Sequence, residues 1–140
     1  MRVYKVVERH YGILQSCWSM DEFCVTYTPG KAAKAPVGKL FAFRSLNDAR
    51  RFLSHLGGTG GRGSHLMVWE AEASGVQGLG KIINYKHRFY GMASRVMRTY
   101  VQAFWDRNWA KARTSASHSL SLGPKGTVLC DTITLVMEVG

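Results

Sequence analysis

The chain has 140 residues, of which 46% are hydrophobic and 15 are glycines, and its formal net charge is +10. This length and composition exclude an intrinsically disordered chain and predict a single domain over residues 1–140 with its own core. No apolar run approaches the ~20 residues of a transmembrane helix, so we expect no membrane span. The first residues alternate charged and apolar side chains, unlike the apolar centre of a signal peptide.

The three cysteines, Cys17, Cys24 and Cys130, form no CxxC pair. An odd number without motif spacing favours reduced thiols and therefore a cytoplasmic location. No pair of Cys or His residues has the spacing of zinc ligands, so the sequence predicts no metal site.

The N-terminal part predicts three strands. Residues 2–9 alternate side chains between two faces, Gly12 permits a turn, and residues 13–18 can return as a second strand. Residues 22–28 are rich in β-branched and aromatic side chains and predict a third strand. Thr28-Pro-Gly-Lys31 then predicts a type II turn, because proline presets φ and glycine accepts a positive φ.

The stretch from Lys39 to Ala73 predicts a strand, a helix, a loop and a second strand. Ser45 occupies an N-cap position with Asp48 three residues later, which is the spacing of a capping box. The apolar side chains that follow recur at helical spacing: Leu46, Ala49, Phe52, Leu53 and Leu56. The glycine-rich residues 57–63 end this helix. Residues 65–73 alternate again, with Met67, Trp69, Ala71 and Ala73 on one apolar face.

The remaining chain predicts a strand at 81–90, a long helix at 92–113, a mobile loop at 114–126 and a strand at 127–139. Residues 92–113 contain no Gly or Pro and keep an apolar period of 3.6, whereas 114–126 is rich in Ser and Gly. Together the elements predict an α+β fold: a mostly antiparallel, twisted sheet of five to seven strands with two helices, the second long and basic.

Most of the positive charge lies in residues 81–113, which carry eight Lys and Arg against Asp106 alone, giving +7. Such a dense patch predicts an acidic partner, namely nucleic acid, an acidic protein surface or a membrane surface. On a helical projection, arginines and tryptophans share the face opposite the apolar one. The predicted binding residues are Lys86, Arg88, Arg95, Arg98, Gln102, Trp105, Trp109 and Arg113. The cations would hold phosphates or carboxylates, and the indoles would stack or anchor, unless another segment covers them.

Catalytic patterns are weak in this sequence. Glu70 and Glu72 share one face of their strand, where they could do acid–base work or simply line the wet side of a sheet. The glycine-rich loop at 57–63 follows a helix and precedes a strand, so it lacks the strand-to-helix context of a phosphate-binding loop. We assign no catalytic residue and no cofactor from these patterns.

Two resemblances bear on function. The segments VTYTPG, GKLFAFRSLNDARRFL, EAE and GTVLCDTITLVMEV resemble small uncharacterised proteins of phage and bacterial genomes. That resemblance implies a phage or mobile-element origin, with the host cytoplasm as the location, and no particular activity. The strand–helix–strand segment from LFAF to WEAE is similar to ADP-ribosyltransferase-like folds. In those folds a late acidic residue orients the ribose, and the late acidic residues here are Asp131 and Glu138.

The sequence therefore predicts a small, basic, non-enzymatic binding protein that engages nucleic acid or an acidic protein surface. An NAD-dependent, ADP-ribosyltransferase-like enzyme is one alternative. A structural or inhibitory module that binds another protein is the second.

Overall fold

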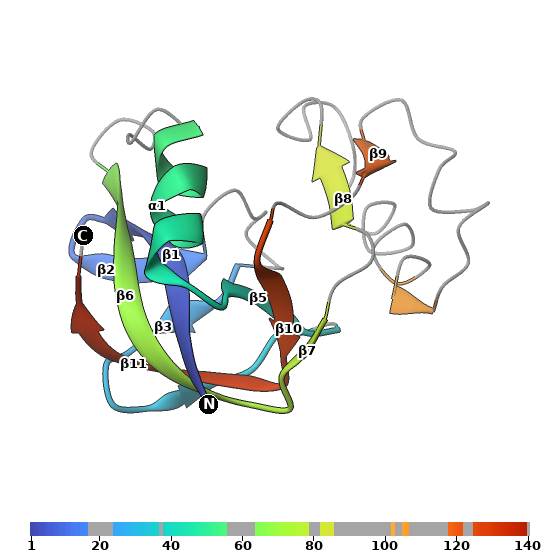
Figure 1. Ribbon diagram of the computed structural model, residues 1–140. Coiled ribbons are helices and arrows are strands. Elements are labelled where there is room, and N and C mark those ends of the chain that lie inside the picture. Colours follow the sequence, from blue (N-terminus) through green and yellow to red (C-terminus); the bar gives the residue numbers. More distant parts are fainter. Residues whose placement is uncertain are drawn as a thin grey trace.

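The computed structural model describes residues 1–16, 24–36, 38–55, 64–78, 82–85, 102, 105–106, 118–121 and 125–139. These residues form one helix, α1 (Leu46–His55), and eleven strands (Figure 1). The strands are β1 (Arg2–His10), β2 (Ile13–Ser16), β3 (Thr26–Tyr27), β4 (Ala32–Ala33), β5 (Leu40–Phe43), β6 (Ser64–Ser74), β7 (Gln77–Gly78), β8 (Ile82–Tyr85), β9 (His118–Ser121), β10 (Thr127–Cys130) and β11 (Thr132–Glu138).

Nine of the strands form one antiparallel sheet whose central path is β4-β11-β6-β1-β5-β10-β7, with β2 paired to β1 and β3 paired to β2. Strand β1 pairs with β6 over all nine of its residues, from Arg2 to His10. Its other edge is shared: β5 pairs at Tyr4, and β2 takes over from Val7 onward. Strands β8 and β9 form a separate two-stranded sheet, which Figure 1 shows apart from the main one.

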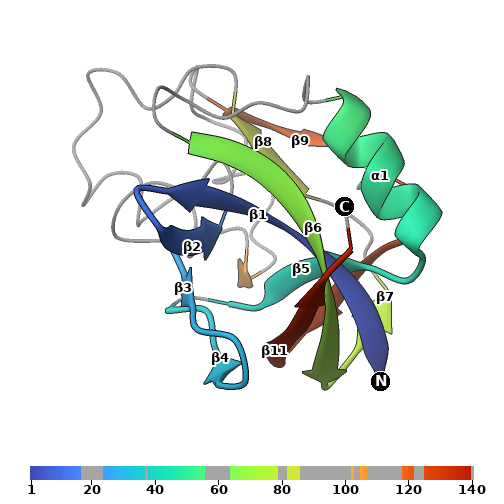
Figure 2. The same ribbon diagram turned by 90° about the vertical axis from the view of Figure 1, so that its left-hand side faces the viewer.

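The main sheet curls into a barrel because one sharp bend joins its distant strands. Only Asp131 separates β10 from β11, yet β10 pairs with β5 while β11 pairs with β6 on the far side of β1. The curvature is clear when the molecule is turned by a quarter (Figure 2). We refer to this curled nine-stranded sheet as the barrel.

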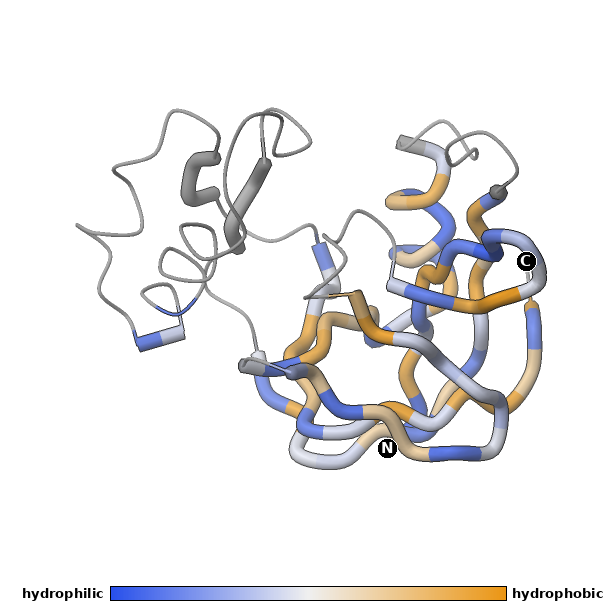
Figure 3. The backbone as a smooth tube through the Cα atoms, turned by 180° about the vertical axis from the view of Figure 1, so that it is seen from behind, coloured by the Kyte–Doolittle hydropathy of each residue, from blue (hydrophilic) through white to orange (hydrophobic). Residues whose placement is uncertain are grey.

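The interior of the barrel is the larger of two apolar clusters, and side chains from seven strands contribute to it. Its buried members are Val3, Val7, Leu14, Val25, Tyr27, Leu40, Ala42, Met67, Ala71, Ala73, Val128, Cys130, Ile133 and Leu135. The expected alternation along β6 is confirmed, since Met67, Ala71 and Ala73 point inward and Trp69 packs against them. Figure 3 shows the same pattern as apolar orange stretches of the strands broken by paler and blue residues.

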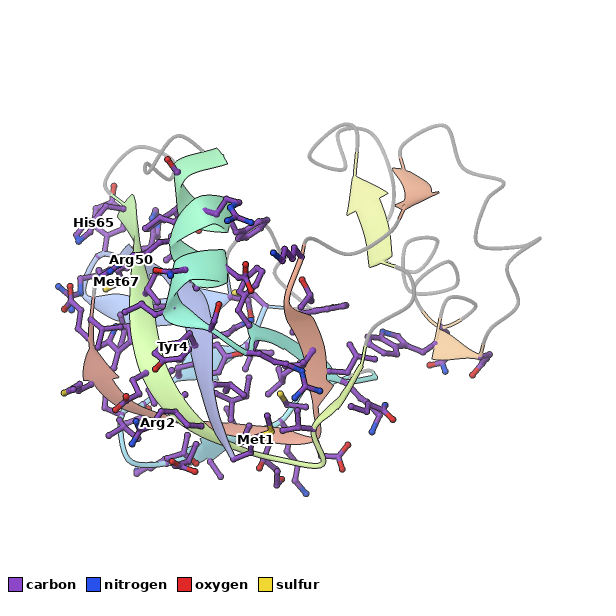
Figure 4. All side chains as sticks on the ribbon, viewed as in Figure 1. Met1, Arg2, Tyr4, Arg50, His65 and Met67 are labelled. Atoms are coloured by element: carbon purple, nitrogen blue, oxygen red, sulfur yellow. The ribbon has the colours of Figure 1, made fainter. Side chains whose placement is uncertain are left out.

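Helix α1 covers the outer face of β1, β5 and β6. Its Ala49 is buried against Val6, Phe43 and Val68 of the sheet, and Tyr4, labelled in Figure 4, packs against this second cluster. The predicted cap forms as expected: the backbone N–H of Asp48 donates to Ser45 Oγ at 3.1 Å, and the Ser45 hydroxyl donates to Asp48 Oδ2 at 2.9 Å. Local sequence therefore determines both the start of this helix and the face it buries.

Two bends meet at one corner of the barrel, where Ser74 and Gly75 of the β6–β7 connection lie beside Asp131. The Asp131 backbone N–H donates to Ser74 O at 2.8 Å, and the Asp131 carboxylate accepts from Lys39 Nζ. Gly75 has a φ of +61°, and a Cβ at this position would overlap the Asp131 side chain. A glycine is therefore required here for both conformation and space.

The predicted second, long helix is wrong: in the part of the chain that the structure describes, α1 is the one helix. Of the range 92–113, only Gln102, Trp105 and Asp106 are described, and the Asp106 N–H donates to Gln102 O at 2.9 Å, the spacing of a helical turn. Apolar period and the lack of Gly and Pro are weak priors that tertiary context overrides. Among the described residues, no helix combines the length and apolar character that crossing a membrane requires.

The strand number is also wrong, because the main sheet has nine strands where five to seven were expected. Three of them, β3, β4 and β7, contain two residues each, too few to produce a readable alternation. The α+β class and the mostly antiparallel pairing are confirmed.

The stretch between β7 and β10 leaves and re-enters the barrel at one place. Gly78 of β7 pairs directly with Val128 of β10, and Gln77 pairs with Leu129. Residues 79–126, here called the insertion, therefore connect two neighbouring strands. Part of the loop predicted at 114–126 lies outside the described residues, and His118–Ser121 within it form β9 against β8.

Candidate functional site

Two of the eight predicted binding residues, Gln102 and Trp105, are among the described residues. The other six lie outside them: Lys86, Arg88, Arg95, Arg98, Trp109 and Arg113. How these eight residues lie relative to one another consequently stays a prediction. The two that are described show how the insertion meets the barrel.

Trp105 packs against the outer face of β5. Its ring centroid lies 5.8 Å from that of Phe41, with the ring planes tilted by 41°. The indole also lies so close to the backbone of Gly38 that any side chain there would overlap it. Trp105 is half-buried by these contacts and so anchors its helical turn to the barrel.

Gln102 is exposed and holds the acidic residue of the same turn. Its Nε2 donates to Asp106 Oδ1 at 3.0 Å, in addition to the backbone hydrogen bond between the two residues. Asp106 is the one acidic residue of the insertion by sequence. Within the described part of the chain, the side-chain partner of this carboxylate is a neutral amide.

Charges on the barrel largely neutralise one another. Arg2 Nε lies 3.3 Å from Glu70 Oε1, and Arg9 Nη2 lies 3.7 Å from Glu138 Oε2. Two further ion pairs join Lys39 to Asp131 and Arg51 to Asp48. Outside residues 79–126 the chain carries ten Lys and Arg against eight Asp and Glu, so the barrel and its helix carry a net charge of only +2.

Five exposed cations form no ion pair within the described part of the chain: Lys31, Lys34, Arg44, Arg50 and Lys125. The backbone N–H of Arg44 donates to Gly126 O at 2.9 Å, which places Arg44 beside the turn that carries Lys125. Lys31 and Lys34 flank β4 at the opposite end of the strand order. They are therefore dispersed over the described surface.

Glu70 and Glu72, the candidate acid–base pair, lie on the outer face of β6 and are engaged in ion pairs. Glu70 pairs with Arg2, and Glu72 Oε2 lies 3.4 Å from the N-terminal ammonium group of Met1. Charged pairs of this kind are the usual way to line the wet side of a sheet. In the ranges that the structure describes, no group of three or more His, Cys, Asp and Glu side chains could hold a metal ion.

One basic side chain lies inside the barrel. Lys5 is 8% exposed, its Nζ donates to Phe41 O at 2.6 Å, and it lies 5.8 Å from the centroid of the Tyr27 ring. The contact has a clear cause: β1 leaves β5 for β2 beyond Tyr4, so it offers no backbone donor to Phe41 O. The sequence carried this signal, because Lys5 stands between inward-facing Val3 and Val7.

Cys130 is fully buried in the same interior. Burial raises the pKa of its thiol, because the apolar surroundings disfavour the thiolate, while the nearby positive charge of Lys5 opposes part of that effect. A thiol in such a site is a packing residue and a poor nucleophile at neutral pH.

Sequence reasoning missed the tip of the β1–β2 hairpin. Gly12 marked the turn, but nothing identified Tyr11 as its other member, with a φ of +48° and 76% of its surface exposed. The only available signal was the Tyr-Gly dipeptide between two alternating segments.

Comparison with protein-family models, with curated proteins and with solved structures gives no match to this chain.

Proposed function

We propose that the protein binds nucleic acid through the insertion, residues 79–126, with the barrel as its scaffold. One observation carries the proposal: by sequence the insertion holds nine Lys and Arg against one acidic residue, which is +8 of the net +10. The rest of the chain holds ten Lys and Arg against eight Asp and Glu. A concentrated positive segment on a nearly neutral scaffold is the charge distribution expected of a polyanion-binding protein.

Two structural features support this division of roles. The β7–β10 pairing holds both ends of the insertion at neighbouring positions on the barrel. Trp105 fixes a third point, by packing on Phe41 and Gly38. Three attachments limit the conformations of the insertion and so reduce the entropy lost on binding.

Nucleic acid is favoured over an acidic protein surface because its charges are dense and regular. Each cation that contacts a phosphate releases condensed counterions, so a cluster of cations gains more from a polyanion than from scattered carboxylates. The insertion also contains Trp109, four residues after the anchoring Trp105, and an indole can stack on an unpaired base.

The test is a titration of labelled single- and double-stranded oligonucleotides at about 50 and about 200 mM salt. The variant Lys86→Gln/Arg88→Gln/Arg95→Gln/Arg98→Gln removes four charges from the insertion. Its matched control, Lys31→Gln/Lys34→Gln/Arg44→Gln/Arg51→Gln, removes four exposed charges from the barrel. We expect wild-type affinity to fall steeply with salt and the insertion variant to lose roughly three units of the log–log salt slope, about 0.7–0.9 per phosphate contact. The control variant should keep most of the wild-type affinity and most of the wild-type salt slope.

Absence of oligonucleotide binding at the lower salt concentration removes the proposal. Equal losses in the two variants show that net charge alone governs binding, which also contradicts a dedicated surface. Binding to polyglutamate as tight as that to oligonucleotides would instead favour an acidic protein partner.

A further inference from the structure

The tip of the β1–β2 hairpin consists of Tyr11 and Gly12, between the paired residues His10 and Ile13. Both tip residues have a positive φ, +48° and +83°, which is the pattern of a two-residue type I′ turn. Asn, Asp and Gly are the residues that this turn prefers. A bulky aromatic residue in the left-handed region is strained, and such strain accumulates at functional positions.

The Tyr11 side chain gains little packing in return for this strain. It is 76% exposed, and its one described ring contact is an edge-on approach to His10, with centroids 4.5 Å apart and planes at 76°. Ile13, across the turn, is also half-exposed. Among the described residues this ring packs on little, so an exposed aromatic side chain in a strained conformation is a candidate contact for a partner.

We propose that Tyr11 stacks on an unpaired base of a bound single strand of nucleic acid. The proposal rests on the function proposed above and adds a contact outside the insertion. The charge of Arg9, just before the tip, is already neutralised by Glu138, so the tip offers an aromatic face and not a charge. Base–aromatic stacking needs no base identity, since every base has a π-face.

The tip and the contact of Trp105 belong to strands that share one edge of β1. Strands β2 and β5 share the same edge of β1, because β6 occupies the other edge along its full length. Trp105 docks on Phe41 of β5, so the anchor of the insertion and the hairpin tip flank one side of β1. The proposal therefore requires a bound strand long enough to run along this edge from the insertion to the tip.

Three substitutions at and away from the tip separate stacking from a structural role. Tyr11→Asn suits the turn better and should raise the melting temperature by a few degrees. It should nevertheless weaken single-strand binding about fivefold to tenfold. The slope of affinity against salt should stay unchanged, because a stacked ring releases no counterions. Tyr11→Phe keeps the ring and should bind as the wild type does. Val136→Ser, which removes another half-exposed apolar side chain, is the matched control and should also bind normally.

A single-stranded oligonucleotide that contains 2-aminopurine gives a direct readout, because stacking quenches its fluorescence. Quenching by the wild type and Tyr11→Phe but not by Tyr11→Asn supports the proposal. Unchanged affinity and quenching in Tyr11→Asn overturn it while leaving the insertion surface intact. If the insertion variant keeps full binding but Tyr11→Asn loses it, the proposed function fails and the tip contact stands. If the wild type binds no oligonucleotide, both proposals fall.

Discussion

Gly75→Ala should destabilise the barrel through both backbone conformation and steric overlap. The backbone φ of +61° costs an alanine about 1 kcal/mol in the left-handed region. The new Cβ would also overlap the Asp131 carboxylate, which must then move away. Displacing it weakens the half-exposed Lys39–Asp131 ion pair, worth up to about 1 kcal/mol after screening, and strains the Asp131 N–H to Ser74 O hydrogen bond, worth about 1 kcal/mol. We expect a total loss of about 2–3 kcal/mol in the free energy of unfolding.

Urea unfolding followed by far-UV circular dichroism measures this loss. Gly30→Ala is the matched control, because Gly30 has a φ of +84° and a Cβ added there would meet no atom within 4 Å. It should cost only the conformational term, about 1 kcal/mol.

A double-mutant cycle isolates the overlap from the backbone strain. In an Asp131→Ala background the carboxylate is absent and only the Cβ of residue 131, 2.9 Å from the added methyl, remains, so Gly75→Ala should cost clearly less there than in the wild type and approach the cost of Gly30→Ala, about 1 kcal/mol. If Gly75→Ala costs the same with and without the Asp131 carboxylate, the two side chains do not compete for space, and the account of the corner is refuted.

Three further outcomes follow from the described contacts. Ser45→Ala should lower the unfolding free energy by about 1 kcal/mol in the same urea assay, because the Asp48 N–H loses its cap; no change would mean that the cap contributes nothing. Lys5→Met should lower it by about 1–3 kcal/mol by leaving Phe41 O without a donor, and an unchanged or higher stability would contradict this. The raised pKa of Cys130 means that the unfolded chain releases the thiol proton first, so stability should fall as the pH rises above the ordinary thiol pKa of about 8.5. The free energy of unfolding, measured by urea titration at each pH, should fall more steeply with pH for the wild type than for Cys130→Ala. Parallel curves for the two proteins would exclude the effect.

Local rules predicted the elements whose causes lie within a few residues. The Ser45 cap, the apolar face of α1 and the alternation of β6 each depend on neighbours in sequence, and the structure has all three. The turn at Thr28–Lys31 also forms, with Lys31 N–H donating to Thr28 O at 3.0 Å and a positive φ at Gly30. These features required no knowledge of the sheet.

Long-range pairing could not be read from the sequence. The predicted strand at 127–139 is real but bends at Asp131, and the bend is accommodated by a glycine far earlier in the chain, Gly75. The two-residue strand β7 exists only because β10 lies beside it. The predicted second helix failed for the related reason that a helical period does not specify what the segment packs against.

The sequence predicted which residue types make up the candidate site, but not how they are arranged in space. The charge excess needed only counting, and it remains the main support for the proposed function. The contacts of Trp105 with Gly38 and Phe41 could not be anticipated, because those residues are far from it in the chain. Tyr11 was overlooked since no periodic pattern marks an exposed turn residue.

The pairing of Gly78 with Val128 also bears on how freely this protein can vary. A loop whose ends are already adjacent adds only about 0.6 kcal/mol of closure entropy for each doubling of its length. Apart from Trp105, which packs on Phe41 and Gly38, residues 79–126 could thus be lengthened, shortened or exchanged at little cost to the free energy of unfolding of the barrel. Divergence in partner preference among descendants of this chain should accordingly concentrate between these two strands, while the corner glycine and the residues inside the barrel stay constrained.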